Sequence, residues 1–256
     1  MKKLFILSIV LTLFLQVSPV FSLDYRELVF QEALSASANG QFEMALNKWN
    51  NYLKRFPDDA AALSNRGNVK LVMGDPKGAL LDQDNAIKIN TNELDPYINR
   101  GIIKESLGLW LEAKDDYSFV ISRDNENFSA MYNLANVEGS LGNWDNARKL
   151  FSNAAQANPG FAMARSSLAL ADYELGNFSK SEKELRKLIR KYPTFVDARA
   201  ALTALTWSKG NYGEAESNWV AVLELDPRYS QEDWLLDVRR WPPSPVQDLM
   251  KFVLVK

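Results

Sequence analysis

Glycine recurs along this chain at one strict interval, and this period constrains the fold more than any other feature. The six glycines that share the interval are Gly40, Gly74, Gly108, Gly142, Gly176 and Gly210. A small residue follows each of them five positions later: Ala45, Ala79, Ala113, Ala147, Ser181 and Ala215. One structural unit is therefore repeated six times, without an insertion between copies.

The copy that ends at Pro159 shows what one unit contains. Gly142 can adopt the left-handed conformation that ends a preceding helix. Ala147 and Ala154 are small enough to let a neighbouring helix come close, and Phe151 is large enough to fill the space beside them. Pro159 lacks an N–H group and ends the helix. The pattern predicts two helices in each unit, joined by a glycine turn.

Helix–turn–helix units with a period of about 34 residues resemble the tetratricopeptide repeat. A glycine or small residue in the first helix of each unit supports the resemblance: Ala33, Gly67, Gly101, Ala135, Ala169 and Thr203. The resemblance covers residues 26–229 and implies an all-α fold, a right-handed α-solenoid of six tandem helix pairs in one domain. The six units are 26–59, 60–93, 94–127, 128–161, 162–195 and 196–229. Stacked pairs share one continuous core and curve around a groove that the first helices line.

Residues 1–22 have the pattern of a secretory signal peptide. Lys2 and Lys3 precede a short apolar core, and a small residue, Ser22, marks the expected cleavage site. The apolar core is short for a membrane span of about 20 residues, and an uncleaved membrane anchor is the alternative. A capping box that begins at Asp24 predicts a helix directly after the cut. Cleavage would remove two lysines and no acidic residue, which changes the net charge from −2 to −4.

The period fails after Tyr229, and we expect residues 230–256 to form C-terminal capping helices. Ser230 is expected to cap one helix, and Ser244 with Pro245 to start the next. Such helices would cover the apolar face of the last repeat. The alternative is a second docking surface, because an unusual run precedes the last helix: Arg239, Arg240, Trp241, Pro242 and Pro243.

The composition argues against catalysis. The chain has no histidine and no cysteine, which excludes the usual acid–base group near neutral pH, a thiol nucleophile and the common zinc sites. The acidic pairs at residues 58–59 and 115–116 are expected on exposed turns or helix faces. We predict a non-enzymatic protein without a cofactor or metal. Its mildly acidic charge argues against a nucleic-acid partner, because phosphate binding needs clustered positive charge.

The resemblance also implies which residues face the groove, namely positions two, five, six, nine and twelve of each first helix. The residues at such positions that we predict to bind a partner are Asn65, Asn68, Asn99, Tyr132, Asn133, Asn136, Tyr173 and Trp207. Asparagine amides offer donors and an acceptor to an extended peptide backbone, and aromatic rings offer apolar anchors. Alternatively, the asparagines bond to neighbouring backbone and the aromatic rings serve ordinary packing between repeats.

A signal peptide, six repeats and a Trp-Pro-Pro tail together resemble exported tetratricopeptide proteins of cyanobacteria and the plastid lumen. The resemblance implies a location in the periplasm or the thylakoid lumen. We predict a scaffold that binds an exported protein or peptide in its concave groove, for example during assembly of a membrane complex. Membrane contact is expected only through an uncleaved signal sequence, and the oligomeric state is left open. The alternative is a structural subunit that self-associates through Trp241 and the last helix.

Overall fold

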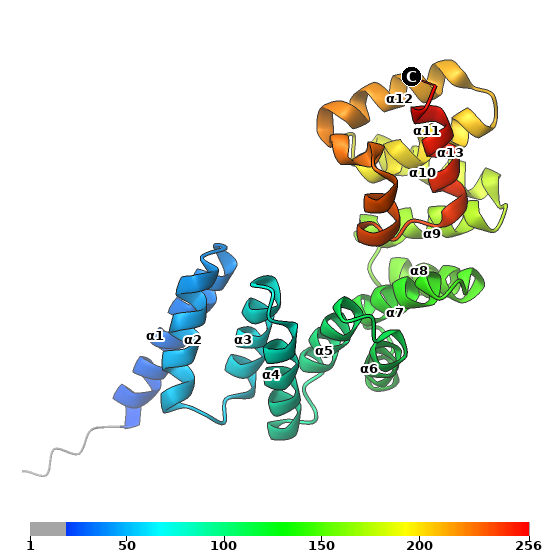
Figure 1. The fold of residues 1–256 in the computed structure, drawn as a ribbon. Helices are drawn as coiled ribbons and strands as arrows, with labels where there is room; N and C mark the ends of the chain where they lie inside the picture. Colours follow the sequence, from blue (N-terminus) through cyan, green and yellow to red (C-terminus); the bar gives the residue numbers. More distant parts are fainter. Residues whose placement is uncertain (1–18, 256) are drawn as a thin grey trace, which may run out of the picture.

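A computed structural model describes residues 19–255, and helices are the regular elements throughout this range (Figure 1). They form six consecutive pairs: α1 (Pro19–Ala38) with α2 (Phe42–Arg55), α3 (Ala60–Val72) with α4 (Pro76–Ile89), α5 (Asp95–Ser106) with α6 (Trp110–Arg123), α7 (Phe128–Ser140) with α8 (Trp144–Ala157), α9 (Ala162–Glu174) with α10 (Phe178–Lys191), and α11 (Val196–Ser208) with α12 (Tyr212–Leu225). The two helices of each pair pack on one another, and the second helix of each of the first five pairs packs on the first helix of the next pair. The predicted all-α solenoid is confirmed.

The glycine turns have the predicted backbone conformation. All six repeat glycines have φ between 72° and 82°, the left-handed region in which a Cβ atom is unfavourable. At the fourth turn, Gly142 N–H donates to Gly139 at 2.9 Å and Asn143 N–H donates to Glu138 at 2.8 Å. These two bonds satisfy carbonyl groups that the end of α7 would otherwise leave unpaired. The chain can then reverse at once into α8.

Small residues in the first helices allow close contact within a pair. A Cβ atom at Gly101 would lie 2.5 Å from the ring of Tyr117, which is fully buried on α6. The glycine therefore makes room for a large ring from the second helix.

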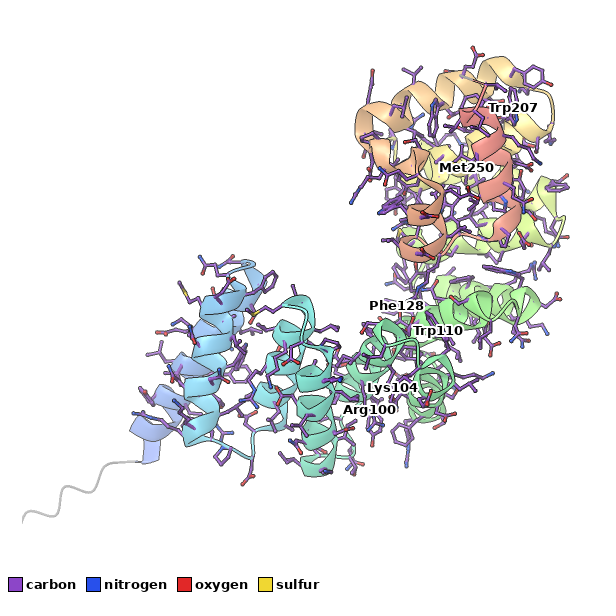
Figure 2. All side chains as sticks on the ribbon, in the orientation of Figure 1. Arg100, Lys104, Trp110, Phe128, Trp207 and Met250 are labelled. Carbon is purple, nitrogen blue, oxygen red and sulfur yellow. The ribbon has the colours of Figure 1, made fainter. Side chains whose placement is uncertain are left out.

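Buried ion pairs connect the two helices of some units. Arg100 Nη2 lies 2.6 Å from Asp116 Oδ1, and Lys104 Nζ lies 2.7 Å from Asp116 Oδ2; the two cations lie on α5 (Figure 2). The same arrangement occurs one repeat earlier, with Arg66, Lys70 and Asp82. Asp116 is buried, so the expectation that it lies on an exposed face is wrong. Two cations from the other helix compensate the carboxylate in the interior.

Glu138 on α7 makes a similar link to the preceding unit. Its Oε1 lies 2.6 Å from Lys114 Nζ, and its Oε2 accepts a 2.9 Å hydrogen bond from Asn143. Burial raises the pKa of Glu138, but the hydrogen bonds from Lys114 and Asn143 outweigh it and hold the pKa below its ordinary value of 4.5. The folded state therefore keeps this carboxylate ionised at a pH where the unfolded chain binds a proton.

We expect this lowered pKa to make the stability of the folded state depend on pH. The contribution of Glu138 is complete above the unfolded pKa and is lost as the pH falls through the lower folded pKa. Glu138→Gln should therefore be less stable than the parent near neutral pH, with the difference shrinking below about pH 4.5. Urea unfolding at pH 7 and at about pH 3 measures the difference in the free energy of unfolding between the variant and the parent. Glu112→Gln, a substitution at an exposed position, is the control. A difference that stays constant across this range would contradict the expectation.

The first helices form the inner wall of the stack. Successive first helices touch one another directly, as in α1 with α3, α3 with α5, α5 with α7 and α9 with α11. Successive second helices in the described range have no comparable contacts. The second helices are thus spread apart on the outside, and the first helices line the concave side.

At the N-terminal end, helical conformation begins at Pro19 and runs through Asp24 without a break. The prediction that a capping box at Asp24 starts the helix is therefore wrong. The signal-peptide prediction rests on residues 1–22, of which 1–18 lie outside the described residues. Within the described part, no helix combines the length and apolar character that a membrane crossing requires.

The C-terminal segment folds back over the last two repeats. It contains a short 3-10 turn, η1 (Pro227–Ser230), a π-helical turn, η2 (Trp234–Val238), and α13 (Pro243–Val253). Neither predicted N-cap is observed. α13 begins at Pro243, before Ser244, and the Ser230 hydroxyl donates to the Pro227 carbonyl instead of capping a helix. We call residues 230–255 the tail.

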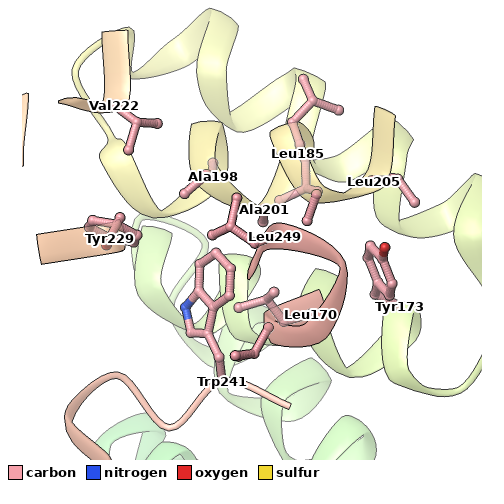
Figure 3. Packing of buried hydrophobic residues seen from close by; sticks show 14 of the residues in the cluster. Leu170, Tyr173, Leu185, Ala198, Ala201, Leu205, Val222, Tyr229, Trp241 and Leu249 are labelled. Atoms are coloured by element: carbon pink, nitrogen blue, oxygen red, sulfur yellow. The ribbon is translucent and has the colours of Figure 1, made fainter. Parts of the chain in front are cut away.

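The tail completes the largest apolar core of the molecule (Figure 3). α13 packs on α11 and α9, and Trp241 lies among Leu170, Ala201 and Leu249. The Phe252 ring contacts Trp207 at 5.4 Å and Trp219 at 5.7 Å between centroids. The predicted cap is present, but it also covers the inner wall of the last two repeats.

Candidate binding groove

The inner wall has an open part and a covered part. The open part is a cavity of about 780 Å³ along α3 and α5, which extends to Ser129 at the start of α7. Three of the predicted residues line it: Asn65, Asn68 and Asn99. We call this cavity the open groove.

Each of these three asparagines has an intramolecular partner. Asn99 Nδ2 donates to Ser64 Oγ of the preceding repeat at 3.1 Å, and Asn65 Nδ2 donates to the Ala61 carbonyl at 2.9 Å. Asn68 Oδ1 accepts from Gln83 at 3.1 Å. Asn65 thus makes the hydrogen bond to neighbouring backbone that was the alternative to ligand binding, whereas Asn99 and Asn68 bond to side chains. An amide offers two N–H donors and two lone pairs, so one such bond leaves capacity for a ligand.

The other two asparagines lie on α7. Asn133 occupies the same position in its repeat as Asn65 and Asn99, and Asn136 corresponds to Asn68. Both are partly exposed, and neither side chain has a hydrogen-bond partner among the described residues. They extend the row of amides past the end of the open groove.

The covered part of the wall belongs to the last two repeats. Groove positions on α11 are buried there, including Asp197 at 2% exposure and Ala200 and Ala204 at 0%. The tail occupies the space that a ligand would otherwise fill.

Asp197 holds the tail through one buried carboxylate. Its Oδ1 accepts from Arg239 Nη2 at 2.7 Å, from the Tyr229 hydroxyl at 2.9 Å and from Trp241 Nε1 at 3.1 Å. Its Oδ2 accepts from Ser166 at 2.7 Å. Burial lowers the pKa of Arg239, but the charge of Asp197 outweighs it and raises that pKa above its ordinary value. Arg239 therefore stays charged at any physiological pH.

A second tail arginine reaches the third repeat. Arg240 forms an ion pair with Glu105 on α5, and its guanidinium lies 5.2 Å from the centre of the Trp110 ring. The Tyr117 hydroxyl donates to the same buried carboxylate, and burial together with Glu105 raises the pKa of Tyr117. Arg240 has φ of 56°, a left-handed conformation that costs a non-glycine residue about 1–2 kcal/mol.

The three aromatic residues predicted to bind a partner contact other residues of the same chain. Tyr173 is 1% exposed, and its hydroxyl donates to Asp248 of the tail at 2.7 Å. Trp207 packs on Phe252, and Tyr132 packs on Phe151 and Phe161. Tyr173 and Trp207 therefore have the packing role that the sequence left open, because the tail covers them.

Sequence reasoning missed the carboxylates that hold the tail. Glu105 and Asp197 occupy groove positions twelve and two of their helices, but they are neither amides nor aromatic residues, the two types predicted to bind a partner. The tail offered the matching signal, since Arg239 and Arg240 are adjacent cations in an apolar segment.

The described residues contain no group of three or more histidine, cysteine or acidic side chains arranged to hold a metal ion. The chemistry of the groove is therefore that of amides, carboxylates and aromatic rings.

Two family models, both described as tetratricopeptide repeat, match the chain. One matches residues 30–94 and 99–160, and the other matches residues 140–205. Together they cover more than half of the chain. The chain belongs to the tetratricopeptide repeat family. Its members are non-catalytic scaffolds for protein–protein interaction, so this chain is a binding scaffold and not an enzyme.

Solved structures share the fold at low sequence identity. PilF of Pseudomonas aeruginosa is 17% identical with a TM-score of 0.70, over 80% of this chain and 93% of PilF. A tetratricopeptide repeat protein from Parabacteroides merdae is 19% identical with a TM-score of 0.63, over 90% and 98%. YrrB, described as having an unusual peptide-binding site, is 18% identical with a TM-score of 0.55, over 75% and 97%. Such similarity concerns the fold alone.

Proposed function

We propose that this chain is an exported scaffold whose open groove binds an extended segment of a partner protein. The observation that carries the proposal is the row of asparagine amides along an uncovered stretch of the inner wall. Extended backbone has unpaired N–H and C=O groups, and amides can satisfy both. The description of YrrB as a peptide-binding tetratricopeptide protein is in keeping with this use of the fold.

The exported location rests on the pattern of residues 1–22. A partner would then be a periplasmic or thylakoid-lumen protein, or the exposed part of a membrane protein on that side. Assembly of a membrane complex is the role we favour, because a non-catalytic scaffold without a cofactor contributes by holding another chain.

Self-association through Trp241 receives less support. The Trp241 side chain is 3% exposed and bonds to Asp197 of its own chain. The same residue cannot serve a second copy without opening the core of the last two repeats.

The test replaces two amides of the open groove, as Asn65→Ala with Asn99→Ala. We expect the double variant to lose between about fivefold and about 150-fold in partner affinity, because each of the two lost hydrogen bonds contributes about 0.5–1.5 kcal/mol. The partner set is defined by capture from the native compartment with the parent protein and quantified by mass spectrometry.

The matched control is Asn47→Ala with Asn153→Ala, two exposed asparagines on second helices. Circular dichroism checks that both double variants keep the helix content of the parent. Equal capture by parent and groove variant would refute the proposal.

A further inference from the structure

We propose that the open groove selects a basic partner segment, one that carries arginine or lysine. This inference rests on the proposed function and specifies the chemistry of the partner. The charge of the groove and the contacts by which the same wall holds the tail support it.

The lining of the open groove is strongly acidic. Four carboxylates and a single cation, Arg26, line it. Arg26 Nη2 lies 2.7 Å from Asp59 Oδ2, so these two charges compensate each other. The other three carboxylates are exposed and form no ion pair within the described residues: Asp58, Glu93 and Asp95. An empty groove thus carries about three uncompensated negative charges.

The helix starts at the groove do not reverse this sign. α3 and α5 begin there, and each N-terminus carries about half a positive charge. Asp59 already caps α3 by accepting from Ala62 N–H at 3.0 Å, and Asp95 lies in the first turn of α5. With the start of α7 at Ser129 counted as well, three half charges are less than three full carboxylate charges, so the net field attracts cations.

The tail provides an independent example on the same wall. Two adjacent arginines of the tail bind carboxylates at groove positions: Arg239 binds Asp197, and Arg240 binds Glu105. Figure 2 shows Trp110, the ring against which the Arg240 guanidinium packs, in the middle of the stack. The inner wall thus already holds one chain segment through carboxylate–arginine contacts, and the open groove presents three carboxylates that form no ion pair within the described residues.

The experiment exposes the immobilised protein to a degenerate library of synthetic dodecapeptides at low salt. The protein is expressed with residues 1–256 and purified in the form that the cell accumulates. Mass spectrometry compares bound peptides with the input. We expect arginine and lysine to be enriched at least fivefold over aspartate and glutamate, and retention to fall at high salt because exposed charges are screened.

Two variants separate the groove from overall charge. Asp58→Asn with Glu93→Gln and Asp95→Asn should abolish the enrichment. Glu43→Gln with Glu112→Gln and Asp145→Asn changes the net charge equally on exposed second-helix positions and should retain it. Loss in both triple variants would assign the effect to overall charge and overturn the inference.

The remaining outcomes distinguish the two proposals. Peptides retained without a charge preference, and lost in the Asn65→Ala with Asn99→Ala variant, would overturn the basic segment but keep the groove function. Enrichment of acidic peptides would likewise overturn the basic segment but keep the groove function. Retention of no peptide at all would overturn both.

Discussion

A chain that ends at Tyr229 is expected to lose the folded structure of its last two repeats. The truncation removes five side chains that are at most 3% exposed: Leu235, Trp241, Val246, Leu249 and Phe252. Full burial of a large apolar side chain contributes about 1.5–3 kcal/mol, so the five contribute on the order of 10 kcal/mol. This is comparable with the whole stability of a typical domain, about 5–15 kcal/mol. The truncation also removes Arg239, the cation that compensates Asp197.

Limited proteolysis with mass spectrometry measures this effect. Cleavage should concentrate in α9 to α12, while α1 to α6 stay resistant, because each repeat depends mainly on its neighbours. The control is a chain that ends at Val253, which loses Lys256 together with Leu254 and Val255, two residues that are 85% and 63% exposed. It should behave like the parent.

Light scattering on the same proteins addresses self-association. If the chain ending at Tyr229 kept its resistance to protease, the tail would not be part of the core. If it also changed from a larger to a smaller assembly, the tail would be an association element, contrary to the packing of Trp241.

The second large effect is expected from Asp197→Asn. The substitution keeps the shape of the side chain but removes the charge that compensates Arg239, which is partly buried beside it. Removing one partner of a buried ion pair costs about 3–5 kcal/mol. The free energy of unfolding of the C-terminal repeats, followed by urea and tryptophan fluorescence, should fall by that amount.

Asp95→Asn is a control at the same position of another repeat. Asp95 is exposed and lines the open groove, so its substitution should change the stability by less than about 0.5 kcal/mol. A similar small loss in both variants would show that the Asp197 carboxylate does not hold the tail.

The parts of this fold that the sequence predicts are those that repeat. Six glycines at one spacing place six turns, and the apolar pattern between them requires paired helices. The spacing also brings Asn65 and Asn99 to one wall, because residues one period apart occupy equivalent places in a stack. Each of these features has several copies, so one irregular copy does not obscure it.

The parts that could not be predicted depend on contacts that occur once. Nothing near Asp197 in the chain indicates that four donors, three of them from beyond residue 228, converge on it. The left-handed backbone of Arg240 and its contact with Glu105 follow from the path of the tail, which has no period. Asp116 was hidden for a different reason, because a lone carboxylate on a helix is usually solvated; its recurrence with Arg100 one period after Asp82 and Arg66 was the available signal.

The pairing of Arg240 with Glu105 connects residues that lie 135 positions apart, in an architecture whose units otherwise touch only their neighbours. A chain is made from its N-terminus, and such an array can mature one unit at a time as it emerges. Here the last two repeats must wait, because the core of α9 to α12 includes tail residues, which are synthesised after them. A chain that stalls before the tail is made would present an unfinished apolar surface to chaperones and proteases, so synthesis of the tail is itself a condition for these repeats to become stable.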